Sequence, residues 1–263
     1  MKLYDLFSLK GKTALITGGG RGIGKYIATG FAEAGADLII TSRKLKNLEA
    51  TRQELEKDYG VRVLPLPCDM SQEGDIRAMV AKAAEAFPKI DILVNDAGAT
   101  WGAPTLQFPL EKWDYVFNVN ARGVWILTQA IANMMVKNGG GNIINIASIA
   151  GMRGTDELSH PAVSYSASKA VVVNLTMNLA IKLAPYKIRV NAIAPGMFGT
   201  DMMAYLEKPE LKPMFDQMVQ MTIPLQRIGR IDDMKGVAVF LASEASSFMT
   251  GHILVVDGGA TAK

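Results

Sequence analysis

Short runs of apolar residues recur along the chain and alternate with longer segments in which apolar and polar residues follow a helical spacing. Several of the short runs are apolar at every position, which is typical of strands buried on both faces of a parallel sheet. The pattern predicts seven strands, at Thr13–Thr17, Asp37–Ser42, Val61–Pro67, Ile90–Asn95, Asn142–Ala147, Ile188–Ala194 and Ile253–Val256.

The longer segments between these runs predict helices that return the chain across the sheet by right-handed connections. This alternation predicts an α/β fold in one domain of residues 1–263, with a doubly wound, seven-stranded parallel sheet and helices on both faces. The helices are expected near Gly22–Ala34, Lys44–Tyr59, Ser71–Phe87, Leu110–Val136, Val163–Leu183 and Asp232–Ala242.

One segment, Met197–Met221, interrupts the alternation and is rich in methionine, proline and charge. We expect it to form a lid over the substrate. Flexible thioethers and aromatic rings adapt to apolar shapes, so Phe198 and Met202 are candidates for contact with a partly apolar substrate. The same pattern would equally suit the packed face of two short helices.

Composition excludes several classes of function. Apolar residues make up 49% of the 263 residues and charged residues 20%, as in globular proteins. The net charge of +3 comes without a basic block, which argues against nucleic-acid binding. Cys68 is the single cysteine, and His160 and His252 lack ligand spacing, so no metal site is expected. With no secretory signal and no apolar run of membrane length, we expect a cytoplasmic protein without membrane contact.

Glycines crowd the turn between the first predicted strand and the first helix, which reads TGGGRGIG over Thr17–Gly24. Glycine lets the backbone approach a pyrophosphate closely, while the helix N-terminus offers amide donors and the positive end of its dipole. The turn lacks the Lys-Ser/Thr ending of a P-loop. In this strand-turn-helix context it predicts a dinucleotide site, although any tight connection of this kind uses glycine.

The end of the second predicted strand indicates which dinucleotide is bound. An NAD site uses a carboxylate there for the ribose hydroxyls, whereas a 2′-phosphate is bound by arginine. Here Ser42 is followed by Arg43, and Arg21 in the glycine turn would supply a second guanidinium. We therefore expect NADP(H) to be favoured over NAD(H), although Arg43 would also suit the start of a solvated helix.

Tyr165 and Lys169 lie four residues apart in a predicted helix, so both side chains project from one face. An ammonium near a phenol favours the phenolate and lowers a pKa that is ordinarily about 10. Such a pair suits proton transfer at neutral pH, although a surface helix can carry Tyr and Lys at the same spacing.

These features together resemble the short-chain dehydrogenase/reductase family, and the resemblance runs nearly end to end. The glycine turn is similar to the family's TGxxxGxG. Asp96 stands where the family's NNAG motif usually has its second asparagine, so any contact there that needs an amide donor is in doubt. Further similar segments are 95–98 (NDAG), 195–200 (PGMFGT) and 256–259 (VDGG).

The resemblance implies a Rossmann-type fold and a catalytic set of Asn120, Ser148, Tyr165 and Lys169. Tyr165 would pass its proton to a carbonyl oxygen as hydride arrives from the nicotinamide. Ser148, at the carboxyl end of the fifth strand, would stabilise the charge that develops on that oxygen. Lys169 would lower the pKa of Tyr165 and hold the nicotinamide ribose, and Asn120 would anchor a water that relays protons from Lys169 to solvent.

The same resemblance implies the cofactor contacts. The glycines would face the pyrophosphate, Asp69 the adenine and Asn95 the adenosine end, with Thr200 near the nicotinamide. Asp69 would also suit a helix cap before Ser71. The expected set is Gly18, Arg21, Gly22, Ile23, Gly24, Arg43, Asp69, Asn95, Ala97, Gly98, Tyr165, Lys169, Pro195, Gly196 and Thr200.

The stretch between the serine and the tyrosine of the catalytic set is several residues longer than in most of the family. The extra residues fall in Gly151–Ser164, so this segment is expected to border the substrate. Arg153 would bind a carboxylate or phosphate there and His160 a second polar group, although both would also suit an exposed loop. Trp101, on the loop after the fourth strand, is a further substrate contact to test.

We therefore predict an NADP-dependent oxidoreductase that interconverts a ketone and a secondary alcohol. Segments 6–12 and 251–259 look like those of gluconate 5-dehydrogenases, whereas segment 95–102 resembles 3-oxoacyl reductases of the rhamnolipid type. Because the methionine-rich lid offers few polar donors, a 3-oxoacyl thioester is the preferred substrate and a sugar acid the alternative. A catalytically silent NADP-binding regulator is disfavoured by the complete catalytic set. The resemblance also implies a homotetramer, with contacts through 122–136, 163–183 and the last strand.

Overall fold

Seven strands form one parallel sheet in the order β3-β2-β1-β4-β5-β6-β7 in the computed structural model, which describes residues 2–157, 160–200 and 208–262. All seven predicted strands are confirmed, and the differences are confined to their ends. The strands are β1 (Thr13–Thr17), β2 (Asp37–Ser42), β3 (Val63–Pro67), β4 (Ile92–Asn95), β5 (Gly141–Ile146), β6 (Ile188–Pro195) and β7 (Ile253–Val256).

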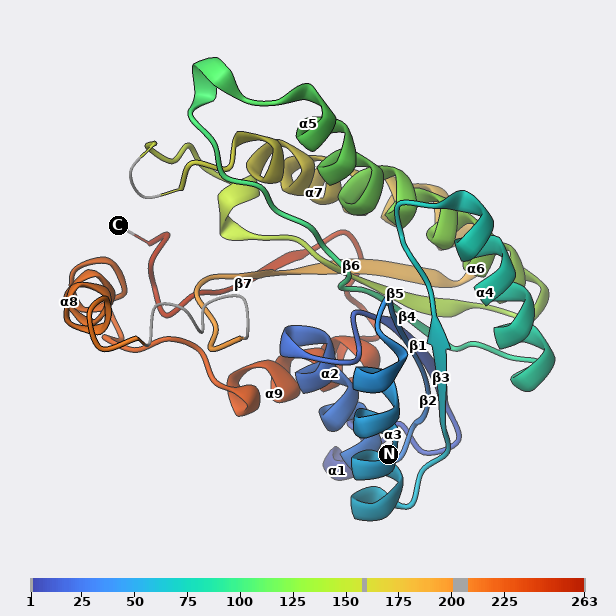
Figure 1. Cartoon of the computed structure of the whole chain (residues 1–263). Coiled ribbons are helices and arrows are strands. Elements are labelled where there is room, and N and C mark those ends of the chain that lie inside the picture. The colour runs from blue at the N-terminus through green and yellow to red at the C-terminus, as the bar shows by residue number, and fades with distance from the viewer. Residues whose placement is uncertain (1, 158–159, 201–207, 263) are drawn as a thin grey trace.

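Helices cover both faces of this sheet (Figure 1), which confirms the predicted doubly wound architecture. One layer holds α2, α3 and α9, and the other holds α4, α5, α6 and α7. None of the described helices is long and apolar enough to cross a membrane. The helices are α1 (Leu3–Leu6), α2 (Gly22–Glu33), α3 (Leu45–Tyr59), α4 (Glu73–Ala86), α5 (Leu110–Phe117), α6 (Val124–Lys137), α7 (Val163–Leu183), α8 (Lys212–Thr222) and α9 (Ile231–Ala242).

Two separate apolar cores explain why several strands carry apolar residues at consecutive positions. Successive side chains of a strand point to opposite faces of the sheet. In β1, Ile16 enters the core formed with α2 and α9, whereas Leu15 enters the core formed with α4, α6 and α7. Neighbouring Ile39 and Ile40 of β2 divide in the same way. Every strand residue therefore has an apolar layer to meet, and burial on both faces stabilises the sheet.

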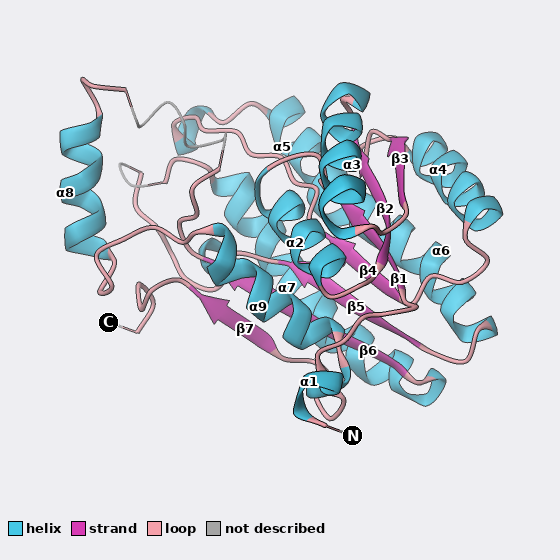
Figure 2. Cartoon of the chain, turned by 90° about the horizontal axis from the view of Figure 1, so that it is seen from below, coloured by secondary structure: helices cyan, strands magenta, loops and turns pink. Residues whose placement is uncertain are grey.

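The strand order reverses between β1 and β4, which places a topological switch point at the centre of the sheet. The connections after these two strands leave in opposite directions, one to α2 on one face and one toward α5 on the other. Seen from below in Figure 2, the strands run side by side between the two helical layers. Open α/β sheets bind ligands in the crevice beyond the carboxyl ends of the strands at such a point.

The single helix predicted over Leu110–Val136 is wrong in one respect, because a π-helical turn, Asn118–Gly123, separates α5 from α6. Two local constraints accompany the wider turn. A Cβ at Gly123 would overlap the carbonyl oxygen of Met70, and Asn120 is held by tertiary hydrogen bonds to Ala99 and Ser168. Wide turns of this kind occur often at functional sites.

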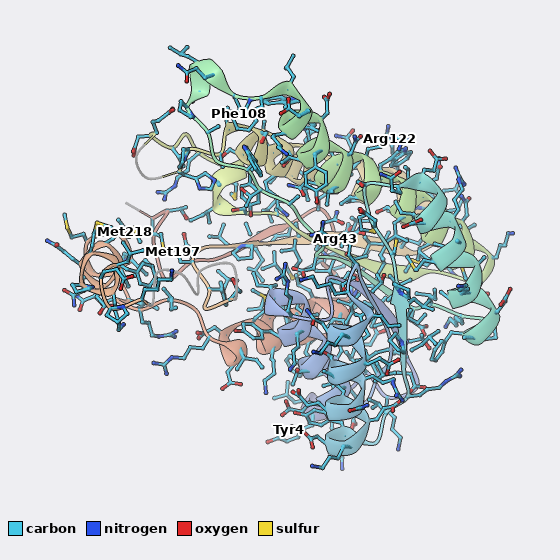
Figure 3. All side chains as sticks on the ribbon, in the orientation of Figure 1. Tyr4, Arg43, Phe108, Arg122, Met197 and Met218 are labelled. Atoms are coloured by element: carbon cyan, nitrogen blue, oxygen red, sulfur yellow. The ribbon has the colours of Figure 1, made fainter. Side chains whose placement is uncertain are left out.

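The segment predicted as a lid contains α8, which lies beyond β7 and outside both helical layers (Figures 1 and 2). Phe215 and Val219 of α8 form a small apolar cluster with Ile223, and Met197 and Met218 pack against it. Met197 and Met218 are labelled beside α8 in Figure 3. Part of the methionine-rich pattern thus packs within the segment itself. Residues 201–207, which include the candidate Met202, lie outside the described residues.

A buried polar network ties the middle of the sheet to the helices above it. The Asn145 side chain, fully buried in β5, accepts a hydrogen bond from Asn95 Nδ2 at 2.9 Å and donates one to Thr176 Oγ1 of α7 at 2.9 Å. The same Asn95 nitrogen also donates to Thr128 Oγ1 of α6 at 2.9 Å. Buried polar groups must find partners inside the protein, so the four side chains constrain one another's orientation.

We expect Asn145→Ala to lower the free energy of unfolding by about 1–3 kcal/mol, because it leaves buried polar groups without a partner. Urea unfolding at a fixed protein concentration measures the change. Asn178→Ala is the matched control, since this exposed asparagine of α7 donates to Asn174 one turn away in the same helix, and its effect is expected within about 0.5 kcal/mol. Equal losses for the two variants would contradict a structural role for the network.

Candidate active site

A cavity of about 300 Å³ lies at the carboxyl edge of the sheet, at the switch point. The strand ends β1 to β6 all contribute to its wall, so residues distant in sequence meet there. Most of the predicted site residues line it. Those residues are Gly18, Arg21, Gly22, Ile23, Arg43, Asp69, Ala97, Gly98, Ser148, Tyr165, Lys169, Pro195, Gly196, Phe198 and Thr200.

The glycine turn after β1 is shaped to admit a ligand group close to the backbone. Gly18 and Gly22 both have positive φ, at 78° and 56°, a conformation that other residues rarely adopt. A Cβ on Gly22 would lie 3.5 Å from Thr200, on the cavity wall. Gly24 serves a different purpose, because a Cβ there would overlap the backbone of Gly18. The turn and the N-terminus of α2 thus form the cradle that a pyrophosphate requires.

The end of β2 presents arginine and no carboxylate to the cavity, as the sequence predicts. The Arg43 Nη1 donates a hydrogen bond at 2.9 Å to the hydroxyl of Tyr115, which reaches across from α5. Arg43 is labelled in Figure 3 at the end of its strand. Arg21 lines the same cavity from the glycine turn. Tyr115 was missed by sequence reasoning, because nothing along the chain shows that α5 faces the second strand.

Asp69 lies on the cavity wall but does not cap the following helix, because the N-cap of α4 is Gln72. It lines the cavity after β3, and its Oδ1 accepts hydrogen bonds from the amide and the hydroxyl of Ser71 at 2.9 and 2.8 Å. The carboxylate is therefore held in place by a local turn. Cys68 beside it is buried, and burial raises the pKa of its thiol to about 12. That thiol remains protonated at neutral pH and is a packing residue.

Asn95 does not contact the cavity with its side chain, which corrects its expected role at the adenosine end. It is 3% exposed, and its amide enters the network with Thr128 and Asn145 described above. The side chain points into the core because β4 is the central strand and has α6 above it. Asn95 therefore supports the site from beneath.

Tyr165, Ser148 and Lys169 converge on one wall of the cavity. The hydroxyls of Ser148 and Tyr165 share a hydrogen bond, although Ser148 follows β5 and Tyr165 lies in α7. Lys169 is 5% exposed; its Nζ donates to the carbonyl of Ile146 at 2.7 Å and lies 5.7 Å from the centre of the Tyr165 ring. A substrate oxygen that reaches both hydroxyls would find a proton donor and a second hydrogen-bond donor together.

The pKa values of this wall are governed first by burial. Burial raises the pKa of Tyr165, the bond with Ser148 lowers it, and the charge of Asp96 raises it. Burial also lowers the pKa of Lys169 to about 8, against the opposing effect of Asp96. The expected lowering of the Tyr165 pKa by Lys169 is therefore not seen here. Loss of solvation acts on the lysine as well, which weakens its preference for the charged form.

Asn120 lies behind this wall and not on it. In the π-helical turn it accepts a bond from the Ala99 amide at 2.7 Å, and it donates to the Ala99 carbonyl and to Ser168 Oγ, each at 2.9 Å. A Cβ on Gly98 would lie 3.6 Å from Asn120 Oδ1 and 3.7 Å from Lys169 Nζ. Both polar groups thus border the space beside Gly98, which is compatible with a water-mediated link between them.

Of the residues expected to contact substrate, two lie beside Tyr165 or on the cavity wall and two lie elsewhere. His160 lies edge-on to the Tyr165 ring, with centroids 5.6 Å apart, and its buried Nε2 has no hydrogen-bond partner among the described residues. Phe198 is buried on the cavity wall. By contrast, Arg153 donates at 3.0 Å to the carbonyl of Ala260, and the Trp101 ring is exposed beneath the ammonium of Lys112. The structure therefore does not place Arg153 or Trp101 on the cavity wall.

The two loops that flank Tyr165 are joined to each other. The amide of Ala103 donates to the carbonyl of Pro161 at 2.9 Å. Further out, the amide and hydroxyl of Thr105 donate to the two carboxylate oxygens of Glu157 at 2.7 and 2.6 Å. The long segment before Tyr165 is thereby fixed to the loop after β4. This pairing, which brings residues 52 positions apart together, had no signal in the sequence.

Among the described residues, no group of three or more His, Cys, Asp or Glu side chains could hold a metal ion.

Known proteins resemble this chain over its whole length. A family model described as enoyl-(acyl carrier protein) reductase matches residues 18–261. The 2-dehydro-3-deoxy-D-gluconate 5-dehydrogenase of Bacillus subtilis is 44% identical over 264 residues, which cover 98% of this chain and 97% of that protein. The 3-oxoacyl-(acyl-carrier-protein) reductase FabG of Aquifex aeolicus is 37% identical over 251 residues, which cover 95% of this chain and 98% of that protein.

A solved structure matches equally completely. It is a gluconate 5-dehydrogenase from Burkholderia cenocepacia in complex with NADP and tartrate, 35% identical in sequence, with a TM-score of 0.90 and 100% of both chains covered. The fold of this chain is thus shared with that protein over the full length of both chains.

Proposed function

This chain belongs to the short-chain dehydrogenase/reductase family, and we propose that it is an NADP-dependent member that interconverts a ketone and a secondary alcohol on a sugar acid. The family membership and the alcohol/ketone chemistry rest on the full-length matches. The observation that carries the proposed mechanism is the contact between the hydroxyls of Tyr165 and Ser148 beside buried Lys169. We also propose a cytoplasmic location, a reducing compartment in which NADPH would be available.

NADP(H) fits the residues that form the cavity. The glycine turn leaves room for a pyrophosphate, and Arg43 and Arg21 supply guanidinium groups where a 2′-phosphate would bind. The gluconate 5-dehydrogenase of similar structure was solved with NADP. When bound, the nicotinamide supplies or accepts the hydride. The chain must position that group and handle one proton.

The proton would be held at the hydroxyl of Tyr165. In reduction, this hydroxyl donates to the carbonyl oxygen, while the Ser148 hydroxyl donates to the same oxygen and stabilises its developing charge. Because burial raises the pKa of Tyr165, the phenol is protonated at neutral pH and ready to act as an acid. Lys169 and Asn120 would then replace the proton from solvent through the space beside Gly98.

A sugar acid replaces the 3-oxoacyl thioester as the preferred substrate class. The relative at 44% identity acts on a sugar acid, whereas the 3-oxoacyl reductase is 37% identical. Burial lowers the pKa of His160, so its ring is neutral, and its unpartnered Nε2 lies close to Tyr165. A polyhydroxylated substrate offers hydroxyl groups that would pair with this nitrogen. Segment 197–221 stays a proposed lid, and a homotetramer stays the proposed assembly.

We expect Tyr165→Phe to lower kcat by at least about 10²- to 10⁴-fold, the usual contribution of a positioned general acid. Dinucleotide binding is expected to remain, because only the hydroxyl is removed. Steady-state kinetics and NADPH fluorescence titration measure the two effects. Tyr4→Phe, at an exposed tyrosine far from the cavity (Figure 3), is the control. Retention of most activity by the Tyr165 variant would show that another group is the acid.

We expect Arg43→Asp to raise KM for NADPH by about 10- to 100-fold, because a charge-assisted hydrogen bond contributes about 1.5–3 kcal/mol. KM for NADH should change little, since that cofactor lacks the 2′-phosphate. Tyr115→Phe is the graded control: it removes the partner of Arg43 but keeps the charge, so a smaller change in the same direction is expected. Equal changes for both cofactors would argue against the NADP preference.

A panel of carbonyl and alcohol substrates tests the substrate class. With NADPH, 5-keto-D-gluconate and acetoacetyl-CoA represent the sugar acid and the 3-oxoacyl thioester; with NADP⁺, D-gluconate and 2-dehydro-3-deoxy-D-gluconate represent the reverse direction. We expect kcat/KM for the best sugar acid to exceed that for the thioester by about tenfold or more. The opposite order would restore the thioester, and NADPH binding without turnover of any compound would favour a silent regulator.

A further inference from the structure

Asp96 is a partly buried carboxyl group in the wall of the cofactor cavity that the proposed mechanism does not use. Its position is well determined. Thr17 at the end of β1 accepts hydrogen bonds through its hydroxyl from the amides of Asp96 and Ala97, both at 2.9 Å. The backbone that carries this acid is thereby fixed to the strand that begins the glycine turn.

The carboxyl group lies against the glycine turn itself. A Cβ at either Gly18 or Gly24 would overlap its Oδ2 atom, and the carboxyl accepts a hydrogen bond from the backbone amide of Gly24. Gly24 is in the first turn of α2, whose N-terminus faces the cavity. An acidic side chain of the protein thus accepts a hydrogen bond from an amide of the first turn of α2, directly beside the glycine turn where a dinucleotide pyrophosphate would bind.

An ionised Asp96 and a bound pyrophosphate would repel each other, because like charges in a poorly solvated site interact strongly. An asparagine at this position, as the family's motif usually has, would bring no charge. One way to relieve the repulsion is to protonate the carboxyl group. Burial raises the pKa of Asp96 to about 7, so protonation is accessible near neutral pH.

The charged groups around Asp96 are few in the described part of the chain. From α7, Lys169 acts on it and lowers its pKa, and Tyr165 experiences its charge. From α2 the carboxyl group meets the backbone amide of Gly24, whereas the Thr17 hydroxyl of β1 bonds to the backbone amide of Asp96. Arg21 lines the same cavity but is not among the causes of its shifted pKa.

We propose, on the basis of the dinucleotide site proposed above, that Asp96 makes cofactor binding proton-linked: the protein takes up a proton on this carboxyl group when the anionic dinucleotide binds. Cofactor affinity is then highest below pH 7, where Asp96 is already protonated. Above pH 7 the carboxylate must first be neutralised, so the affinity falls as pH rises. Asp96 acts in this way as a positioning residue that determines when the glycine turn accepts a pyrophosphate.

The experiment is fluorescence titration of the full chain with NADH and with NADPH between pH 6 and 9. A single linked proton raises Kd by up to about tenfold per pH unit above pH 7. Both cofactors should give the same slope there, because the 2′-phosphate, with a pKa near 6, is already ionised. For Asp96→Asn we expect a flat profile and a lower Kd at pH 8.5 than the unmodified protein.

Lys169 needs a separate variant, since its pKa of about 8 lies in the same window. Lys169→Met removes this positive charge. The rise of Kd with pH should keep its slope but begin at a higher pH, because the charge of Lys169 lowers the pKa of Asp96. Asp58→Asn, at an exposed acid of α3, is the charge-matched control and should match the unmodified protein.

The role of Asp96 would be overturned, with the dinucleotide function intact, by an unchanged slope in Asp96→Asn or by a slope abolished by Lys169→Met alone. Weaker binding of Asp96→Asn at every pH would also overturn it, since the carboxylate would then be a required acceptor for Gly24. Failure of the unmodified chain to bind NADH or NADPH at any pH would refute both this role and the proposed function.

Discussion

Burial of both faces of a parallel sheet is the constraint on which the rest of this structure depends. Each strand must be apolar at nearly every position, as Leu15 and Ile16 illustrate by entering opposite cores. Each connection must then cross a face of the sheet and return, so all strands run in one direction and their carboxyl ends meet at one edge. Polar side chains that follow the strands are thereby collected around a single cavity, without any of them having been neighbours in the sequence.

The cavity is poorly solvated, and this determines the charge states of the ionisable groups that line it. Burial is the largest cause of the shifted pKa at Asp96, Tyr165 and Lys169, and it favours the neutral form of each. The pKa of Asp96 rises to about 7 and that of Lys169 falls to about 8, so the two opposite charges are both easily lost near neutral pH. Such a site is sensitive to any further charge that enters it, and the proposed cofactor is an anion. Cofactor binding would then depend on the protonation of these groups as well as on the shape of the cavity.

Much of the fold could be predicted from local pattern, whereas the catalytic set was implied by the resemblance to a known family. The strands could be located because a short run that is apolar at every position is typical of a strand buried on both faces, and the glycine turn because positive φ at Gly18 and Gly22 requires glycine. Predictions failed where a side chain had a choice of surroundings. Asn95 was expected at the adenosine end and instead turns into the core toward Asn145. The bond of Arg153 to Ala260, near the end of the chain, likewise had no signal in the sequence. The π-helical turn around Asn120 has no local signature, because its hydrogen bonds go to distant residues.

The sequence by itself determined the doubly wound sheet, the position of the glycine turn and the identity of the polar residues at each strand end, because all of these follow from residue type and spacing. Only the tertiary structure decided which of those residues meet. It brought the hydroxyl of Ser148 to Tyr165, the guanidinium of Arg43 to Tyr115, and the Asp96 carboxyl to the glycine turn. These contacts join elements far apart in the chain, and their geometry depends on how the helices pack on the sheet, which no local pattern encodes.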